Sequence, residues 1–387
     1  MLTLIIKPTH ICNLNCTYCY DRPNREKDKS KMSFETVENI FKIARTKTNK
    51  INVIWHGGEP LLMGADWYKH IYESIIPKYF DLNDVRSSYQ TNGTIFDPYF
   101  LAFTEKYNIS LGMSYDGVLN NQTRKNTDKL KENRIKADIC GFKNGWRSYL
   151  MVVTPENMHT LIESYKESIE EDFLLEFSEV FYEQTEVDAI DDFTGILKAY
   201  KEFLKYFLTS ISDRDIPRPF RFYINHVLGI RVESICENIE CAGQWLGIHP
   251  DGTVFPCGRD WKDEYTYGNI NDMETFNDIK KSTGYALMKQ GENFVRNHCN
   301  GCELNVVCNG GCPNTRMLTT GSLVTHNESQ CLFANGMVNL VEEVLINLKA
   351  YEIINTDMLK RIAKSNYISY KELKESISKR REETCMQ

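Results

Sequence analysis

Apolar and polar positions alternate along the first half of the chain in a pattern typical of strands separated by helices. Short runs rich in β-branched residues, such as LTLIIK (2–7) and INVIW (51–55), predict strands. Between them, residues 34–45 place apolar side chains at helical spacing directly behind Ser33, which predicts a helix with a serine N-cap. Further strands are predicted at SSYQT (87–91), ISLGMS (109–114) and SYLMVV (148–153). This alternation indicates parallel β/α units.

The predicted fold class is α/β, a partial (β/α)6 barrel resembling an incomplete TIM barrel. We expect the barrel to occupy residues 1–216, a linker and a cysteine-rich domain residues 217–335, and a helical extension residues 336–387. The texture changes after the barrel, where HPDGTVFPCG (249–258) predicts a β-hairpin. Barrels of this kind keep their chemistry at the carboxyl ends of the strands, where the candidate residues below are expected.

Charge and hydropathy exclude several classes of function. The formal net charge is −7 and the sequence pI about 5.7, which argues against a nucleic-acid binder. No apolar run approaches the roughly 20 residues of a membrane span, and the first residues are too short for a signal peptide. We therefore expect a cytoplasmic protein. The segment from Glu163 to Asp192 holds twelve acidic residues and one lysine. It is interpreted as a solvated face or as a surface that attracts a basic peptide.

The 13 cysteines are grouped rather than scattered. Three lie within residues 12–19 and eight within residues 236–331, and only Cys140 and Cys385 stand apart. A cytosolic chain keeps its thiols reduced, so grouped cysteines at short spacing indicate metal ligands rather than disulfides. Cys140 and Cys385 have no partner at metal spacing, and we interpret them as a packing residue and a tail residue.

The first group lies in HICNLNCTYCYD (10–21), and it offers three thiols to one site. A structural zinc ion normally takes four ligands, so Cys12, Cys16 and Cys19 favour a 4Fe–4S cluster that leaves one iron open. His10 is the alternative fourth ligand.

This group resembles the CxxxCxxC signature of radical S-adenosylmethionine (SAM) enzymes. Three later motifs are similar to those of the same family: HGGEP (56–60), QTNGT (90–94) and SYDG (114–117) with a downstream arginine. The resemblance implies that SAM binds the open iron and yields a 5′-deoxyadenosyl radical. It also implies a SAM pocket at these positions: Gly57, Gly58, Glu59, Asn92, Ser114 and Arg124.

The second cysteine group resembles the SPASM domain, a seven-cysteine extension of radical SAM enzymes that modify peptides and proteins. The resemblance implies two auxiliary 4Fe–4S clusters, and a zinc ribbon, which needs four ligands, is the weaker alternative. Cys241, Cys257 and Cys312 are assigned to the first cluster, with Cys236 as its expected fourth ligand. The second cluster is assigned Cys299, Cys302, Cys308 and Cys331. If Cys236 does not bind, one iron is open to a substrate thiolate.

The reaction is less determined than the architecture. Anaerobic sulfatase maturases, which resemble this chain, carry an aspartate directly after the cysteine that corresponds to Cys257, and here that position is Gly258. Asp260 is the remaining candidate for a catalytic carboxylate. We expect an oxidoreductase that cross-links a ribosomally made precursor peptide, through a carbon–carbon or a thioether bond. The alternatives are formylglycine formation, synthesis of a quinone-cofactor precursor, or an electron-transfer or scaffold protein that only carries clusters.

The partners follow from this reading. A flavodoxin or ferredoxin is expected as the reductase. Because the first cluster cysteine is already at position 12, we expect the leader of the precursor peptide to bind a separate protein or the acidic segment.

Overall fold

The computed structural model describes residues 1–142, 148–179, 193–210, 214–230 and 241–347, together with residues 363, 371–373 and 375. The strands in these parts form one sheet in the order β6-β5-β4-β3-β2-β1-β7-β8-β9. Their bounds are β1 Leu2–Ile6, β2 Ile51–Trp55, β3 Val85–Thr91, β4 Ser110–Ser114, β5 Ser148–Val153, β6 Leu174–Glu179, β7 Trp245–Ile248, β8 Thr253–Phe255 and β9 Gly268–Asn269.

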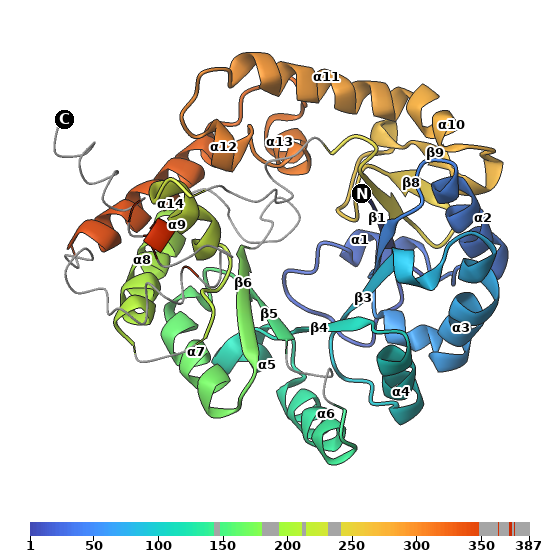
Figure 1. Cartoon of the computed structure of the whole chain (residues 1–387), viewed down its shortest axis with the longest axis horizontal. Coiled ribbons are helices and arrows are strands. Elements are labelled where there is room, and N and C mark those ends of the chain that lie inside the picture. Colours follow the sequence, from blue (N-terminus) through green and yellow to red (C-terminus); the bar gives the residue numbers. More distant parts are fainter. Residues whose placement is uncertain are drawn as a thin grey trace.

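Strands β1 to β6 are parallel and lie in sequence order, which confirms the partial (β/α)6 barrel. β7 pairs with the free side of β1, also in parallel, and β8 and β9 follow in antiparallel order. The predicted hairpin at 249–258 is therefore the β7–β8 pair. The sheet is curved in Figure 1, with the helices on its convex outer side.

Helices connect and cover the strands. Their bounds are α1 Arg22–Lys27, α2 Phe34–Arg45, α3 Ala65–His70, α4 Pro98–Lys106, α5 Asn120–Thr123, α6 Thr127–Ile139, α7 Leu161–Glu170, α8 Phe193–Thr209, α9 Phe220–Val227, α10 Phe276–Lys281, α11 Thr283–His298, α12 Asn305–Cys308, α13 Pro313–Thr320 and α14 Glu328–Asn347. The predicted cap of α2 is present, since the Ser33 side chain accepts a hydrogen bond from the backbone N–H of Thr36. Helix α14 packs against α8 and α9 (Figure 1).

Alternate residues of each strand face the helices and the barrel interior, which we call the lumen. On β2, Val53 and Trp55 are fully buried on the outer side, whereas Asn52 and Ile54 are half-buried on the lumen side. The outer side carries the main core, where Trp55 packs edge-on against Tyr68 of α3. The lumen is therefore the less filled side of the sheet.

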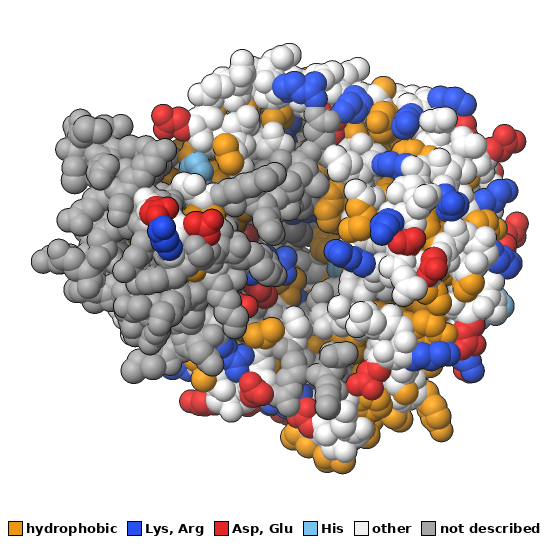
Figure 2. Space-filling view, viewed as in Figure 1, with side chains coloured by type: hydrophobic (Ala, Val, Ile, Leu, Met, Phe, Trp, Pro, Cys, Tyr) orange, Lys and Arg blue, Asp and Glu red, His pale blue; other side chains and the backbone are white. Residues whose placement is uncertain are grey.

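Surface charge agrees with the composition. Figure 2 shows lysine, arginine and acidic side chains interspersed on the visible face. Such mixing is unlike the single-sign patch that nucleic-acid binders use. Among the described helices, none is long and apolar enough to cross a membrane.

Candidate functional site

The three cysteines of the first group lie on the loop between β1 and α1, at the carboxyl edge of the barrel. Cys16 is buried, and Cys12 and Cys19 are partly buried. Burial is the main cause that raises the pKa of the Cys16 thiol to about 11; Arg124 opposes the shift, and Cys19 and Cys12 add to it. A bound metal removes such protons outright. The loop thus gathers three thiols in a largely water-excluded place.

The Gly-Gly-Glu segment after β2 binds the start of this loop through backbone hydrogen bonds. Gly58 donates its backbone N–H to Thr9 (3.0 Å), and Glu59 donates its own to Ile11 (2.9 Å). A Cβ on Gly58 would lie 2.2 Å from the Ile11 carbonyl oxygen and 2.4 Å from that of His10. The glycine is therefore required for the close approach of two backbones directly before Cys12.

Glu59 is fully buried and fixed by three hydrogen bonds. Its carboxylate accepts from the hydroxyl of Thr91 (2.7 Å), the backbone N–H of Asn92 (2.8 Å) and that of Leu61 (3.0 Å). Desolvation raises its pKa to about 7 against the opposing effect of these donors. Glu59 joins the ends of β2 and β3, as expected of a pocket wall, and its contact with SAM stays a prediction.

Two further predicted pocket residues contact the cysteine sulfurs. The Asn92 amide nitrogen lies 3.7 Å from Cys12 Sγ, and an Arg124 guanidinium nitrogen lies 3.8 Å from Cys16 Sγ. Ser114, at the end of β4, accepts a hydrogen bond from Gln90 (3.0 Å). The structure thus brings Asn92 and Arg124 to the cysteine loop and places Ser114 on the lumen side.

Asp116, to which the sequence assigned no role, positions Arg124. It is fully buried and accepts hydrogen bonds from Arg124 Nε (3.0 Å), the Tyr18 hydroxyl (2.6 Å) and the Thr123 hydroxyl (2.6 Å). Tyr18 lies between Cys16 and Cys19 in sequence, so this one carboxylate ties the end of β4 to the cysteine loop.

Replacing Asp116 by alanine is expected to lower the free energy of unfolding by about 3–5 kcal/mol, because Arg124 would keep its charge in a buried place with no carboxylate. Urea denaturation of the cluster-loaded protein measures the loss. Asp128→Ala, at an exposed position in the first turn of α6, is the matched control and should cost less than about 1 kcal/mol. Equal midpoints for the two variants would contradict this role.

A buried ion cluster on the other side of the loop also escaped sequence analysis. Asp21 accepts from Lys7 Nζ (2.8 Å) and contacts His10 Nδ1 (2.8 Å), and all three side chains are buried. Lys7 holds the pKa of Asp21 well below its usual range despite its burial. His10 is therefore engaged by Asp21 through Nδ1, and its alternative role as a fourth ligand stays a prediction. The signal in the sequence was a lysine at the end of an apolar strand.

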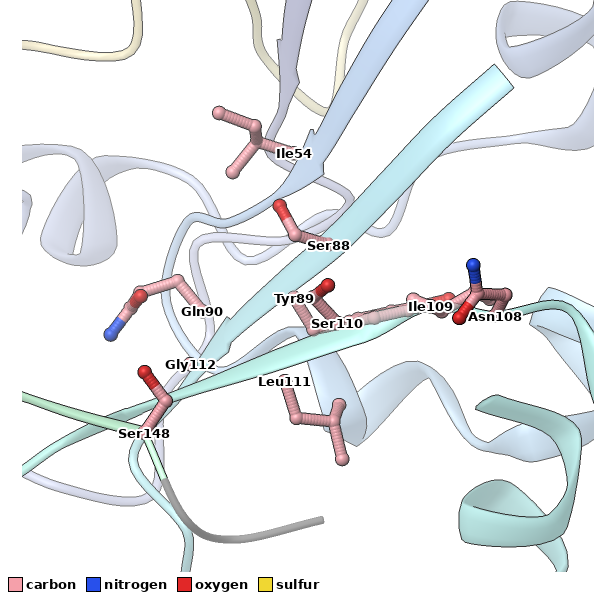
Figure 3. A pocket seen from close by; sticks show the side chains of 10 residues that line it. All are labelled: Ile54, Ser88, Tyr89, Gln90, Asn108, Ile109, Ser110, Leu111, Gly112 and Ser148. Carbon is pink, nitrogen blue, oxygen red and sulfur yellow. The ribbon is translucent and has the colours of Figure 1, made fainter. Parts of the chain in front are cut away.

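The lumen contains a pocket of about 420 Å³ that draws on four adjacent strands (Figure 3). Its lumen-facing residues are small or uncharged: Ile54 of β2, Ser88 and Gln90 of β3, Ser110 and Gly112 of β4, and Ser148 of β5. None of the described residues that line it is charged. Hydroxyl and amide groups in a neutral hollow suit polar, uncharged ligands such as peptide backbone.

Neighbouring cysteines of the second group influence one another within the two predicted sets, and the sets themselves stay predictions. Cys312 raises the pKa of Cys257, and Cys331 and Cys299 raise that of Cys308, in each case after the larger effect of burial. Arg316 is buried, and burial lowers the pKa of its guanidinium. Cysteines of both predicted sets oppose this shift: Cys312 and Cys241 of one, and Cys299 and Cys308 of the other. Arg316 also borders a cavity of about 200 Å³ beside Cys241.

Other predicted residues are less informative. Cys236 and Cys385 lie outside the described residues. Cys140 is exposed at the end of α6. One Asp260 carboxylate oxygen accepts a hydrogen bond from Asn24 (3.3 Å). Part of the acidic segment is neutralised, since Glu167 pairs with Lys131 at 2.7 Å, and residues 180–192 lie outside the described residues.

The chemistry of these donors fits iron–sulfur clusters. Thiols are the preferred protein ligands of such clusters, and each predicted set includes at least one buried cysteine: Cys16 in the first, Cys241 and Cys312 in the second, and Cys308 in the third. Amide and guanidinium N–H groups near Cys12 and Cys16 suit negatively charged sulfur.

Comparison with known protein families agrees with this chemistry. Residues 6–167 match the model of the radical SAM superfamily, and residues 236–303 match that of SPASM, an iron-sulfur cluster-binding domain. The chain is a radical SAM enzyme with a SPASM domain. This enzyme accordingly uses a SAM-binding 4Fe–4S cluster together with auxiliary clusters. These matches concern domains and not single ligands, so the assignment of each cysteine to a cluster stays a prediction; Cys308, Cys312 and Cys331 also lie beyond the second match, which ends at residue 303.

The relatives include sulfatase-maturating enzymes and a cyclopropyl synthase. A cysteine-type anaerobic sulfatase-maturating enzyme of Clostridium novyi is 28% identical over 333 residues, which cover 80% of this chain and 87% of the relative. A radical SAM cyclopropyl synthase of Paramaledivibacter caminithermalis is 24% identical over 369 residues, which cover 88% of this chain and 74% of the relative. The solved structure of native anSMEcpe with bound AdoMet and the Cp18Cys peptide superposes with a TM-score of 0.73 at 25% identity, over 90% of this chain and 99% of that one.

Proposed function

We propose that this radical SAM SPASM enzyme modifies a precursor peptide by closing a cross-link between two of its side chains, through a carbon–carbon or a thioether bond. Cys12, Cys16 and Cys19 would hold the SAM cluster. Gly57, Gly58, Glu59, Asn92, Ser114 and Arg124 would surround SAM, and the sets of Cys241, Cys257, Cys312 and of Cys299, Cys302, Cys308, Cys331 would hold the auxiliary clusters. When bound, these groups supply a 5′-deoxyadenosyl radical and acceptors for single electrons.

The lumen supports a peptide substrate. The pocket of about 420 Å³ has room for a few residues of a chain, and its hydroxyl and amide groups match the hydrogen-bonding groups of peptide backbone. A relative's structure holds a peptide together with AdoMet. Strand ends inside a barrel also keep water from a reactive radical.

The observation that carries the choice of reaction is the packing at Gly258. A Cβ at this position would lie 2.5 Å from Cγ2 of Ile5, on the lumen side of β1. The place that holds an aspartate in sulfatase maturases therefore has no room for a carboxylate here. Asp260 is held by Asn24 and offers no equivalent group at that place. A reaction that ends in bond formation between side chains makes less demand on a base at this position.

Formylglycine formation from cysteine is the second candidate, favoured by the sulfatase-maturating relatives. Mass spectrometry of a peptide encoded beside the gene, co-expressed with the enzyme, separates the two. Cross-linking removes two hydrogens and leaves no aldehyde, whereas oxidation of a cysteine to formylglycine removes two hydrogens and also exchanges sulfur for oxygen. Because oxidation of a serine also removes two hydrogens, the product is treated with a hydrazide probe. An aldehyde, or an unchanged mass with inverted stereochemistry, would contradict the proposed cross-link.

The proposed partners are a flavodoxin or a ferredoxin as reductant and a separate protein for the leader of the precursor peptide. The acidic segment is a second candidate for the leader, though Glu167 and Glu171 are already paired with Lys131.

A further inference from the structure

His56 directly follows β2, two residues beyond Ile54, which lines the pocket in the lumen. Its backbone N–H donates to Ile6 (2.9 Å), which continues the parallel pairing of β2 with β1 by one residue. Alternation therefore places His56 on the same side of β2 as Asn52 and Ile54, and Ile54 lines the pocket (Figure 3). The ring is half-buried, in keeping with a place at the edge of a hollow.

Local hydrogen bonds fix the tautomer of the His56 ring. The backbone N–H of Gly57 lies 2.7 Å from Nδ1, and an amide N–H only donates, so Nδ1 must accept and carries no proton. The Tyr20 hydroxyl also approaches Nδ1, at 3.4 Å. A neutral ring must then carry its proton on Nε2.

The surroundings keep the ring neutral. Burial, and after it the positive charge of Lys7, lowers the pKa of His56 to about 4 against the opposing effect of Asp21. Lys7 is itself neutralised by Asp21, which it contacts at 2.8 Å. At neutral pH the ring thus offers an uncharged N–H donor.

The donor on Nε2 is available. Both hydrogen-bonding contacts of the ring are made by Nδ1, and Nε2 makes no hydrogen bond to any of the described residues. A neutral donor on the strand side that lines this uncharged pocket suits an uncharged acceptor, and a carbonyl oxygen is the acceptor that every peptide provides.

We propose that the Nε2–H of His56 donates a hydrogen bond to a carbonyl oxygen of the peptide substrate, and so positions the peptide between the pocket and SAM. This inference rests on the proposed peptide substrate. It also implies that His56 does not replace the carboxylate missing at position 258, because the Gly57 N–H occupies the lone pair on Nδ1.

The test uses the cluster-loaded enzyme with SAM and a synthetic peptide that has one central cysteine and uncharged flanking residues. His56→Leu is expected to raise the dissociation constant and the KM of this peptide about tenfold, with a smaller change in kcat. His56→Gln retains an N–H donor and should stay within about threefold of the parent enzyme. His159→Leu, which removes an exposed histidine, should change neither constant. Iron content and visible absorption show whether each variant is folded and loaded.

A second measurement reads the tautomer directly. Nitrogen-15 NMR of the unreduced enzyme should show His56 with its proton on Nε2 and no titration near neutral pH. A proton on Nδ1, or equal peptide affinity for His56→Leu and the parent, would overturn the inference. If the parent enzyme neither binds nor modifies the peptide while His56 shows the expected tautomer, the proposed peptide substrate is wrong instead, and the carbonyl donor role falls with it.

Discussion

Replacing Cys12, Cys16 and Cys19 together by alanine is expected to abolish the formation of 5′-deoxyadenosine from SAM, a loss of at least about 10⁴-fold. The three sulfurs share one loop and one partly buried place, and among the described residues no other cysteine contacts Asn92 or Arg124. Their removal leaves no thiol to hold an iron next to the predicted SAM pocket.

The same variant should keep its auxiliary clusters. Because the described cysteines of the second group lie within residues 241–331, far from this loop in sequence, the variant is expected to lose about one third of the bound iron and to stay folded. Anaerobic assays with dithionite and SAM, together with iron analysis, measure both effects. The control is Cys140→Ala, at an exposed position with no predicted ligand role. Undiminished 5′-deoxyadenosine formation by the triple variant would contradict the assignment.

Gly58→Ala is expected to reduce activity roughly 100-fold or more, because a misplacement of about 1 Å at a reacting centre has effects of this size. The added methyl group would meet the backbone oxygens of His10 and Ile11, at 2.4 and 2.2 Å, and neither belongs to a flexible side chain. The loop must therefore move, and Cys12 moves with it. The expected sign is incomplete loading of the SAM cluster, measured as a lowered yield of its reduced electron paramagnetic resonance (EPR) signal.

Gly64→Ala is the matched control for this effect. Gly64 has a positive φ of 82°, but nothing lies within 4 Å of its would-be Cβ. The Gly64→Ala variant therefore tests backbone strain alone. It is expected to lose about 1 kcal/mol of stability and to keep the activity of the parent enzyme. Similar losses of activity for both variants would show that the close approach at Gly58 is not what matters.

Periodicity predicted the fold well where one side of an element meets the core. The strands β1 to β5 and the capped helix α2 were predicted because apolar residues recur there at the right spacing. Strand β6 was missed because two glutamates interrupt its apolar pattern. Glu176 lies on the lumen side, and Glu179 lies on the same side as the buried Leu175 and Phe177, where it accepts a hydrogen bond from Tyr200. A lumen that tolerates polar residues weakens the pattern on which prediction depends.

The motif residues of the site could be predicted from the sequence, whereas the buried ion pairs that position them could not. Cysteine spacing and strand-end motifs pointed to Cys12, Asn92 and Arg124, which the structure brings together. Asp116 supports Arg124 through a buried contact, and Lys7 meets Asp21 across 14 residues of a loop. Such contacts depend on how the loop folds back over the strand ends, which no local pattern records.

The central claim is that Cys12, Cys16 and Cys19 hold a 4Fe–4S cluster whose open iron binds SAM. Electron–nuclear double resonance on the reduced enzyme tests it directly, with SAM that carries ¹⁵N in its amino group and ¹⁷O in its carboxylate. The account predicts that both labels couple magnetically to the reduced cluster and that the coupling disappears in the triple cysteine variant. Absence of both couplings, or a histidine nitrogen bound to the iron in place of SAM, would contradict it.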